Sequence, residues 1–362
     1  MRILLVIYGS LEQQTGGYRY DARLVALLES RGHQVTLLSQ TWGSPVRRLL
    51  EDRPKRIVER AREAGAQLIL EDELNHLSLR RSNRRLRREL GVPIVSIVHH
   101  LASREEHSRL GAFLLRPLER EYLETVDGAI YNTSVTRDDV AGLLGRELPG
   151  VVCLPSAEGL REPGQMGEAD DPGGGRGLRL LSVGSLIRRK RIDAVIEAVS
   201  LLRDEPVSLT VVGGREAEPA TARALYTLTR RLGLEERVTF AGSLTSGELA
   251  AAYRDHDLLV LVSQYEGFGM VYLEAMAHGT PVIASEAGGA REIVRDGYNG
   301  FLCRAGSAPA VAAQIRRLLR EPELRENLAS GARRTAASHP TWEESFDSAE
   351  AYLREMRGVD GL

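Results

Sequence analysis

The residues best suited to chemistry lie in one stretch, residues 263–281, which reads SQYEGFGMVYLEAMAHGTP. Gly267 and Gly269 allow a sharp turn that leaves backbone amides uncovered, and the pattern indicates that a helix begins near Gly269. The N–H groups and positive dipole end of such a helix bind anions such as phosphate. Glu266 precedes the turn, and Glu274 would lie under ~8 Å along the axis from the helix start. The stretch therefore predicts a phosphate site whose flanking carboxylates accept hydrogen bonds from ligand hydroxyls, including a ribose diol.

A second group of candidates follows strands that are expected in the first half of the chain. His99 comes directly after an apolar run at residues 93–98, and His100 stands beside it, so the sequence leaves open which histidine belongs to a site. Another run, residues 67–70, precedes three acids and a histidine: Glu71, Asp72, Glu73 and His76. These four could contact an acceptor, form a polar loop or bind a metal ion, but no further ligands point to a metal.

The elements around these residues alternate between short apolar runs and segments of helical period. In the first half, strands are expected at residues 2–8, 34–39, 67–70, 93–98, 128–131 and 151–154. In the second half, they are expected at residues 178–183, 207–212, 238–240, 257–262 and 281–284. Strands that alternate with helices indicate βαβ units and parallel sheets covered on both faces. Ligands of such sheets bind at the carboxyl ends of the strands, where all the candidate residues lie.

The chain is long enough for two such domains. Residues 161–177, REPGQMGEADDPGGGRG, have no periodicity and are rich in glycine, proline and acids, which is typical of a linker. The predicted architecture is therefore an α/β domain at residues 1–160, a hinge, and a second α/β domain at residues 178–340. We expect the ligand in a cleft between the two domains, where hinge closure would exclude water.

Composition excludes several classes of protein. The 48 basic residues include only two lysines, Lys55 and Lys190, and with 50 acidic residues the net charge is −2, which argues against a nucleic-acid partner. No apolar run approaches the ~18–20 residues of a membrane-spanning helix. The apolar start of the chain indicates a buried strand and not a signal peptide. Cys153 and Cys303 define neither a disulfide framework nor a metal site and suit a reducing cytoplasm.

Residues 263–281 resemble the signature of the retaining glycosyltransferases of family 4, in which seven residues separate two glutamates within an EGFG…LEAMA-G-PV pattern. Residues 182–198, SVGSLIRRKRIDAVIEA, resemble the family's VGRL…KG…LIEA segment, and GHQVTLL at residues 32–38 is similar to its GHEV strand entry. The resemblance implies the GT-B architecture, in which two Rossmann-like, doubly wound parallel-sheet domains face a central cleft. It also implies that the first domain binds the acceptor and the second the nucleotide sugar, and that a final helix at residues 341–362 crosses back to the first domain.

The resemblance also implies roles for individual residues. Lys190 matches the lysine that contacts the donor diphosphate, and His99 the histidine that contacts the transferred sugar or the acceptor. The implied catalytic residues are His99, Lys190 and Glu266. The implied donor-binding residues are Gly16, Gly17, Arg189, Lys190, Glu266, Gly267, Phe268, Gly269, Met270, Val271 and Glu274. The chain departs from the pattern at Ser185, where a second phosphate-binding arginine is usual, and at Arg191, where glycine is common; Arg188 or Arg189 could supply the missing charge.

The implied reaction moves a hexosyl unit from a nucleoside diphosphate sugar to a lipid or glycan acceptor, with retention of anomeric configuration and without a metal or other cofactor. Six arginines between Arg80 and Arg88 indicate either a solvated helix face or a patch that contacts an anionic membrane, so we expect a cytoplasmic protein that can lie on the inner face of the membrane. Alternatives are a sugar-nucleotide epimerase, a glycoside phosphorylase, a retaining glycosidase and a non-catalytic sugar-nucleotide-binding protein. The donor base and sugar, the acceptor and the oligomeric state stay open.

Overall fold

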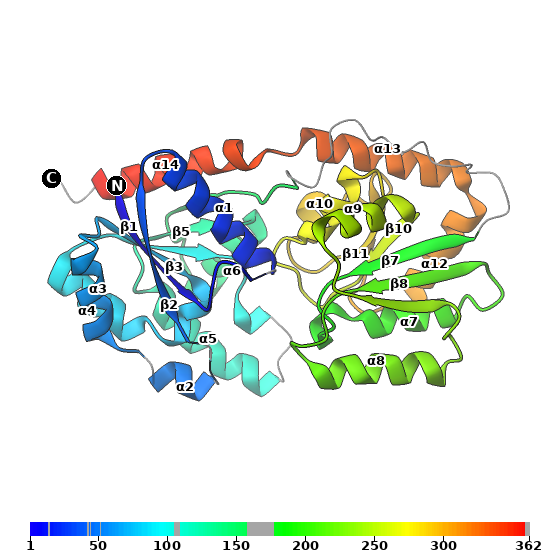
Figure 1. Ribbon diagram of the computed structural model, residues 1–362, viewed down its shortest axis with the longest axis horizontal. Helices are drawn as coiled ribbons and strands as arrows, with labels where there is room; N and C mark the ends of the chain where they lie inside the picture. The colour runs from blue at the N-terminus through cyan, green and yellow to red at the C-terminus, as the bar shows by residue number, and fades with distance from the viewer. Residues whose placement is uncertain are drawn as a thin grey trace. The chain divides into compact units, whose positions relative to one another are not determined.

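The computed structural model describes residues 1–13, 15–41, 43, 45–50, 52–104, 109–157 and 177–358. The predicted linker, residues 161–177, lies outside the described residues except for Gly177. The chain divides into two compact units (Figure 1). Unit 1 comprises Met1–Pro155 with Pro340–Leu362, and unit 2 comprises Ser156–His339.

Unit 1 is built on a parallel six-stranded sheet of order β2-β1-β3-β4-β5-β6. Its strands are β1 (Arg2–Tyr8), β2 (Gln34–Gln40), β3 (Leu68–Asp72), β4 (Ile94–Val98), β5 (Gly128–Tyr131) and β6 (Gly150–Val152). Its helices are α1 (Gly16–Ser30), α2 (Pro45–Leu50), α3 (Pro54–Glu63), η1 (Glu73–Leu77), α4 (Arg80–Leu90), η2 (Ala102–Arg104), α5 (Arg109–Leu123), α6 (Ser134–Leu144) and α14 (Trp342–Gly358). Strands β3 and β4 are buried along their whole length, as expected for strands of a parallel sheet that is covered on both faces.

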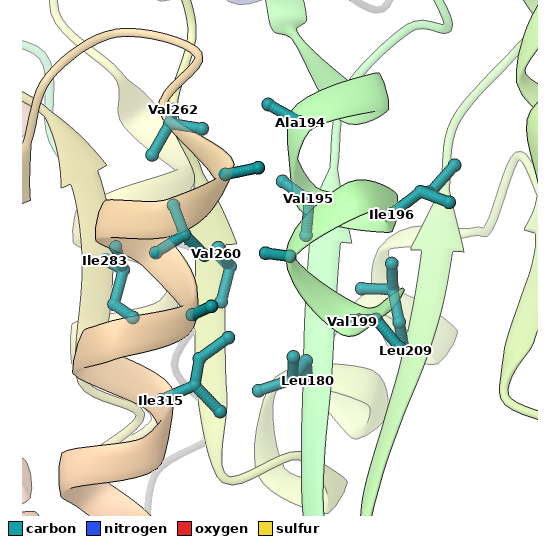
Figure 2. Packing of buried hydrophobic residues seen from close by; sticks show 14 of the residues in the cluster. Leu180, Ala194, Val195, Ile196, Val199, Leu209, Val260, Val262, Ile283 and Ile315 are labelled. Atoms are coloured by element: carbon teal, nitrogen blue, oxygen red, sulfur yellow. The ribbon is translucent and has the colours of Figure 1, made fainter. Parts of the chain in front are cut away.

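Unit 2 repeats this architecture with a sheet of order β12-β11-β10-β7-β8-β9. Its strands are β7 (Leu178–Val183), β8 (Val207–Val212), β9 (Val238–Gly242), β10 (Leu258–Leu261), β11 (Val282–Ser285) and β12 (Gly300–Cys303). Its helices are η3 (Arg188–Lys190), α7 (Ile192–Ser200), α8 (Pro219–Arg231), α9 (Ser246–Asp255), α10 (Met270–Ala277), α11 (Ala290–Ile293), α12 (Ala308–Arg320) and α13 (Pro322–Ser338). Figure 2 shows Val195 of α7 and Ile315 of α12 in the apolar core against Val260 of β10.

The last helix, α14, packs against α1 and β6 of unit 1. Trp342 and Phe346 stack on each other, and both contact the ring of Tyr20 edge-on. Ser345 Oγ donates a hydrogen bond of 2.6 Å to the carbonyl of Leu154. The C-terminal segment is therefore part of the fold of unit 1, although the rest of that unit ends about 185 residues earlier in the sequence.

Each sheet contains one place where the chain reverses its direction of winding. In unit 1 it lies between neighbouring strands β1 and β3, and in unit 2 between β7 and β10. Ligands of open parallel sheets bind at the carboxyl ends of the strands at such switch points. The loops after these four strands are therefore where the site should be sought.

Two elements differ from the sequence-based expectation. Strand β12 was not among the expected strands, because its four residues follow glycine and tyrosine and offer too short an apolar run. Helix α5 was not expected either, since Pro117 interrupts its pattern. No helix in the described part of the chain is both long and apolar enough to cross a bilayer.

Candidate functional site

In unit 2, the loops after β7 and β10 are joined by two hydrogen bonds at the switch point. The backbone N–H of Gln264 donates to the carbonyl of Arg189 at 2.9 Å, and Arg189 Nη1 donates to the carbonyl of Tyr265 at 2.6 Å. These contacts set the basic turn η3 beside the glycine turn that precedes α10. The sequence motifs around residues 182–198 and 263–281 therefore form one site.

At the centre of this site, Lys190 and Glu266 form an ion pair. Lys190 Nζ lies 2.8 Å from Glu266 Oε1, and Arg189 Nη1 lies 3.7 Å from Glu266 Oε2. Glu266 is only 5% exposed. Burial raises the pKa of its carboxyl, but the charges of Lys190 and Arg189 outweigh burial and hold the pKa below its usual value. The site thus contains an ionised carboxylate that can accept from hydroxyls, next to an ammonium that can bind a phosphate.

Position 269, in the turn before α10, requires glycine for steric reasons. Gly269 has φ +89°, and a Cβ there would lie 2.4 Å from the ring of Tyr272. The turn brings the chain into α10 at Met270 and Val271, whose N–H groups have no acceptor within the helix because they belong to its first turn. Phe268 is 4% exposed and contacts the ring of His339. This geometry supplies the amides and dipole end that the sequence predicts for anion binding.

A second glycine pair, which sequence reasoning missed, holds the backbone of Glu266 in place. Gly289 N–H donates to the carbonyl of Glu266 at 2.8 Å, and a Cβ on Gly288 would lie 2.1 Å from that carbonyl oxygen. The pair is separated by three residues from the expected strand at residues 281–284, so a Gly-Gly pair in the loop after a strand was the available signal.

Glu274 lies inside α10 and is 2% exposed. Its Oε2 accepts a hydrogen bond of 2.8 Å from the hydroxyl of Tyr253. Neither Glu266 nor Glu274 points into bulk solvent. Exposure of both side chains to solvent would have contradicted the predicted phosphate site.

The loop after β7 also explains the departure at Arg191. Arg191 has φ 51° and ψ 38°, and it is the one non-glycine residue of the described chain with a positive φ. This left-handed conformation is the reason that glycine suits the position. The Arg191 side chain forms a forked contact with Asp193, with Nε–Oδ1 and Nη2–Oδ2 distances of 3.0 Å. Of the two arginines before Lys190, Arg189 approaches Glu266, whereas Arg188 is exposed.

In unit 1, His99 lies at the carboxyl end of β4 within a group of acids. His99 Nε2 is 3.0 Å from Asp21 Oδ1, and its backbone N–H donates to Glu73 Oε2 at 3.0 Å. A Cβ on Gly17 would lie 3.2 Å from His99 Cδ2, so the glycine pair at the start of α1 lets this helix approach the imidazole. Asp21 was missed from the sequence, because it carries no signal apart from its place in an amphipathic helix.

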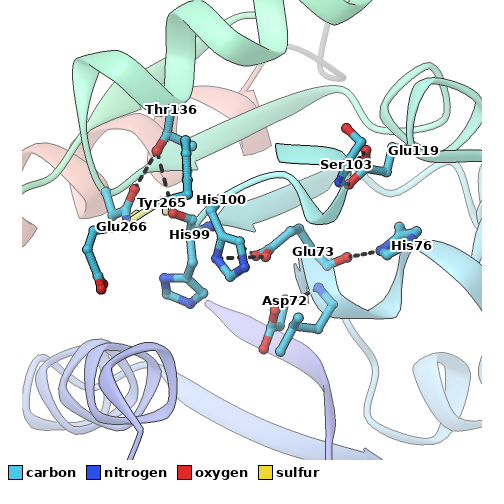
Figure 3. A network of polar contacts seen from close by, with 12 residues as sticks. Asp72, Glu73, His76, His99, His100, Ser103, Glu119, Thr136, Tyr265 and Glu266 are labelled. Atoms are coloured by element: carbon cyan, nitrogen blue, oxygen red, sulfur yellow. Dashed lines mark hydrogen bonds and ion pairs between the residues drawn. The ribbon is translucent and has the colours of Figure 1, made fainter. Parts of the chain in front are cut away.

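Glu73 lies between two histidines, as Figure 3 shows. His100 Nδ1 is 4.0 Å from Glu73 Oε1, and His76 Nδ1 is 3.0 Å from the Glu73 carbonyl. His100 is partly exposed, whereas His99 is 7% exposed and bonded to Asp21, so the two neighbours differ in environment. Glu71 points elsewhere and accepts from Asn83 Nδ2 at 2.9 Å. The acids at the end of β3 and directly after it therefore do not form one group.

The charges in this cluster are strongly coupled. Burial lowers the pKa of His99, but the carboxylates of Asp21, Glu73 and Asp72 outweigh it and raise the pKa to about 10. Burial raises the pKa of Asp72 to about 7 and that of Glu73 well above its usual value. Burial lowers the pKa of His76 to about 4. At neutral pH the cluster holds an imidazolium on His99 and a neutral imidazole on His76.

Three ligand atoms of this cluster, one each from Asp21, Asp72 and His99, lie within 4.8 Å of one another. Two carboxylates and an imidazole are a donor set that suits a divalent cation. In this structure His99 Nε2 and Asp21 Oδ1 form an ion pair at 3.0 Å.

Comparisons with known proteins identify the family of the chain. Residues 175–335 match the family model described as Glycosyl transferases group 1. Over 289 residues the chain is 32% identical to a D-inositol 3-phosphate glycosyltransferase of Actinosynnema mirum, a match that covers 75% of this chain and 69% of that enzyme.

Two solved structures share the fold. Sucrose-phosphate synthase of Thermosynechococcus elongatus has a TM-score of 0.83 at 23% identity, covering 99% of each chain. HepE of Anabaena, in complex with UDP, has a TM-score of 0.75 at 22% identity, covering 98% of this chain and 100% of that one. The predicted GT-B fold class and the family resemblance are confirmed. The chain belongs to the group 1 glycosyltransferases.

Proposed function

We propose that the protein transfers a hexosyl unit from a nucleoside diphosphate sugar to a lipid or glycan acceptor, with retention of anomeric configuration and without a metal. Unit 2 would hold the donor, and unit 1 the acceptor. The observation that carries the proposal is the Lys190–Glu266 ion pair beside the first turn of α10, at the switch point of the sheet of unit 2. A phosphate-binding cation and a hydroxyl-binding carboxylate are both needed for a nucleotide sugar, and here they occur together.

Catalysis would rest on stabilising the leaving diphosphate. Lys190, the amides from Gly267 to Val271 and the dipole of α10 are preorganised donors for the negative charge that develops there. Glu266 would orient the sugar through its hydroxyls, and Glu274 would bind the ribose. In a front-face displacement the leaving phosphate takes the proton of the acceptor hydroxyl, so retention requires no separate general base. His99, as an imidazolium, would donate a hydrogen bond at the reacting face.

The comparisons suggest which ligands to test first. The HepE structure contains UDP, which supports a uridine diphosphate sugar as donor. The name of the Actinosynnema mirum relative supports including a phosphorylated polyol among the acceptors. Lipid and glycan acceptors complete the panel.

The decisive experiment measures donor binding and transfer together. We expect one of the uridine, guanosine or adenosine diphosphate sugars to raise the melting temperature of the protein by mass action. The Lys190→Ala and Glu266→Gln variants should lose this shift and the donor turnover, while Arg223→Ala, at an exposed position on α8, should keep both. Proton NMR of the product reports the anomeric configuration, and activity in excess EDTA reports metal independence. Equal donor turnover in wild type and Lys190→Ala would refute the donor site.

The same assay separates the alternatives. An epimerase would convert the donor sugar without an acceptor, and a phosphorylase would require inorganic phosphate. A non-catalytic binding protein would show the thermal shift without turnover. A retaining glycosidase needs two catalytic carboxyl groups about 5–5.5 Å apart that both face the substrate. Here Glu274, inside α10, accepts a hydrogen bond from Tyr253, and Glu266 is paired with Lys190.

The proposal includes a peripheral position on the inner face of a cytoplasmic membrane, with the arginines of α4 as the contact. Several arginines of α4 are paired with acids: Arg80 and Arg84 with Glu121, Arg85 with Glu89, and Arg87 with Asp127. Arg88 is exposed at the end of the same helix. Sedimentation with anionic vesicles, compared between wild type and Arg84→Gln/Arg88→Gln, tests this contact.

A further inference from the structure

Unit 1 contains a cavity that no part of the proposed mechanism uses. Its volume is about 160 Å³, and it lies at the carboxyl end of the edge strand β2, between that strand and helices α2 and α3. Its lining residues are Leu38, Gln40, Thr41, Arg47, Arg53, Arg56 and Ile57. Three of the seven are arginines and none is an acid. A single water needs only ~10–15 Å³ of such volume, so the cavity has room for a polyatomic ion.

The polar groups of this cavity are mainly hydrogen-bond donors. Arg53 and Arg56 are exposed, and neither forms an ion pair within the described part of the chain. Guanidinium groups present several N–H donors in a fixed plane, and they therefore favour an anion with several oxygens.

The nearest acid in the sequence is turned away from the cavity. Asp52 directly precedes Arg53, but its carboxylate accepts from the backbone N–H of Arg81 at 2.7 Å and of Ser82 at 3.1 Å, at the start of α4. It also accepts from the Ser82 hydroxyl at 2.5 Å. Asp52 therefore satisfies helix N–H groups and leaves the positive charge of Arg53 unneutralised.

The cavity differs in this respect from the arginine-rich helix α4. There, Glu121 bridges Arg80 and Arg84, and Asp127 pairs with Arg87. A guanidinium that already holds a carboxylate must lose it before it binds another anion, whereas Arg53 and Arg56 need lose only water. Arg53 and Arg56 are thus available to an anion at the cavity.

We propose that this cavity binds a phosphate group of the acceptor, with the lining arginines Arg47, Arg53 and Arg56 as its donors. Because the strands of the sheet are parallel, the end of β2 lies at the same edge as the ends of β3 and β4, which carry Glu73 and His99. An acceptor anchored there by its phosphate would place its hydroxyl-bearing part along this edge. That the bound ligand is the acceptor rests on the proposed function. That the cavity binds an anion does not depend on it.

Calorimetric titration of the full chain with inorganic phosphate, without donor, tests the site directly. We expect Arg53→Gln/Arg56→Gln to weaken phosphate binding about tenfold or more, since a hydrogen bond to a charged group contributes about that factor. The control Arg223→Gln/Arg230→Gln makes the same charge change on exposed positions of α8 and should bind as wild type does. Lys190→Gln should also retain the binding, because it alters only the donor site. Equal affinity in wild type and Arg53→Gln/Arg56→Gln, or loss of all binding in Lys190→Gln, overturns the proposal.

Two further arms identify the source of the phosphate. Glycerol 3-phosphate represents a soluble phosphomonoester, and vesicles of phosphatidic acid in phosphatidylcholine represent a lipid headgroup. The ligand whose binding falls in Arg53→Gln/Arg56→Gln is of the class that the cavity takes, and if neither falls the assignment to an acceptor phosphate is wrong. These titrations need no sugar transfer, so they test the anion site separately from the proposed reaction. Failure of the proposed reaction would appear instead as donor turnover that Lys190→Ala leaves unchanged.

Discussion

Replacing Asp21 by asparagine tests whether the carboxylates of unit 1 hold His99 as an imidazolium. Asp21 is fully buried, and its Oδ1 lies 3.0 Å from His99 Nε2. Asparagine keeps the size of the side chain and an oxygen that can accept the same hydrogen bond, but it carries no charge. The substitution therefore removes the electrostatic attraction and leaves the packing of α1 nearly unchanged.

The magnitude follows from the pKa of His99, which is raised to about 10, against 6.5 for an ordinary histidine. A raised histidine pKa contributes stability that is fully present below pH 6.5 and is lost as the pH rises through about 10. At pH 7 the pKa of His99 in the folded protein lies about three pH units higher, which corresponds to a stabilisation on the order of 4 kcal/mol. The net gain is smaller, because burial raises the pKa of Asp72 to about 7 and that of Glu73 well above its usual value, and both carboxyls then oppose folding at neutral pH.

Two measurements follow His99 in wild type and in Asp21→Asn. An NMR titration of the imidazole should show wild type protonated through pH 8, and the variant with a pKa shifted down towards 6.5 or below, since burial then acts against less opposing charge. Urea unfolding between pH 6 and pH 10 should show wild type losing stability with rising pH, and the variant losing much less.

Glu350→Gln is a matched control in the same unit. Glu350 Oε1 lies 2.8 Å from His33 Nε2, so the substitution also replaces a carboxylate beside a buried histidine. Burial raises the pKa of Glu350, but its hydrogen bonds with Arg31, His33 and Arg354 lower it to about 2. Its stabilisation is present above pH 4.5 and is lost as the pH falls through about 2. This variant should therefore lower the stability by a constant amount between pH 6 and pH 10 and change the pH dependence only on the acid side. A His99 pKa that stays near 10 in Asp21→Asn, or a wild-type stability that is flat from pH 6 to pH 10, would refute the reasoning.

Three further substitutions test single contacts. Gly288→Ala places a Cβ 2.1 Å from the Glu266 carbonyl, so it should abolish the thermal shift with a nucleotide sugar; an unchanged shift would show that the loop yields without cost. Tyr253→Phe leaves the buried Glu274 carboxylate without the Tyr253 hydroxyl and should lower the free energy of unfolding by about 1–3 kcal/mol in urea titrations; no loss would mean that another donor replaces the hydroxyl. Arg191→Gly relieves a left-handed conformation that costs about 1–2 kcal/mol and loses a partly exposed pair with Asp193 worth at most about 1 kcal/mol. The melting temperature should therefore stay level or rise, and a clear fall would mean that the pair dominates.

The donor side of the site could be predicted from the sequence because its parts are local. Lys190 follows the end of β7 by seven residues and Glu266 follows the end of β10 by five, and the switch point makes these strands neighbours. Glu266 was predicted from its place before the glycine turn, whereas Lys190 was assigned by the family resemblance. Gly288 was missed because its role is steric. The position requires glycine because the Glu266 carbonyl oxygen lies against it, and that contact is visible only in the folded structure.

The surroundings of His99 could be predicted only in part. That a histidine stands at the end of β4 is visible in the sequence, but its partner Asp21 is 78 residues away, inside a helix. The contact depends on how α1 lies across the strand ends, which periodicity does not determine. Glu71 and Asp72 are adjacent and were considered together, yet side chains alternate along a strand, so Glu71 reaches Asn83 of α4 while Asp72 lies near His99.

The arginines of unit 1 show why charge density along a sequence is a poor guide to binding. Between Arg80 and Arg88 the sequence shows six arginines and no acid, and this run suggested an anionic partner. Most of its partners are acids of other elements, Glu121 and Asp127, which are distant in sequence and near in space. Around the cavity the arginines are fewer and are interleaved with acids in the sequence. Asp52, however, accepts hydrogen bonds from backbone N–H groups at the N-terminus of α4. An anion responds to the charge that remains after folding has paired the rest, and Arg53 and Arg56 are part of that remaining charge.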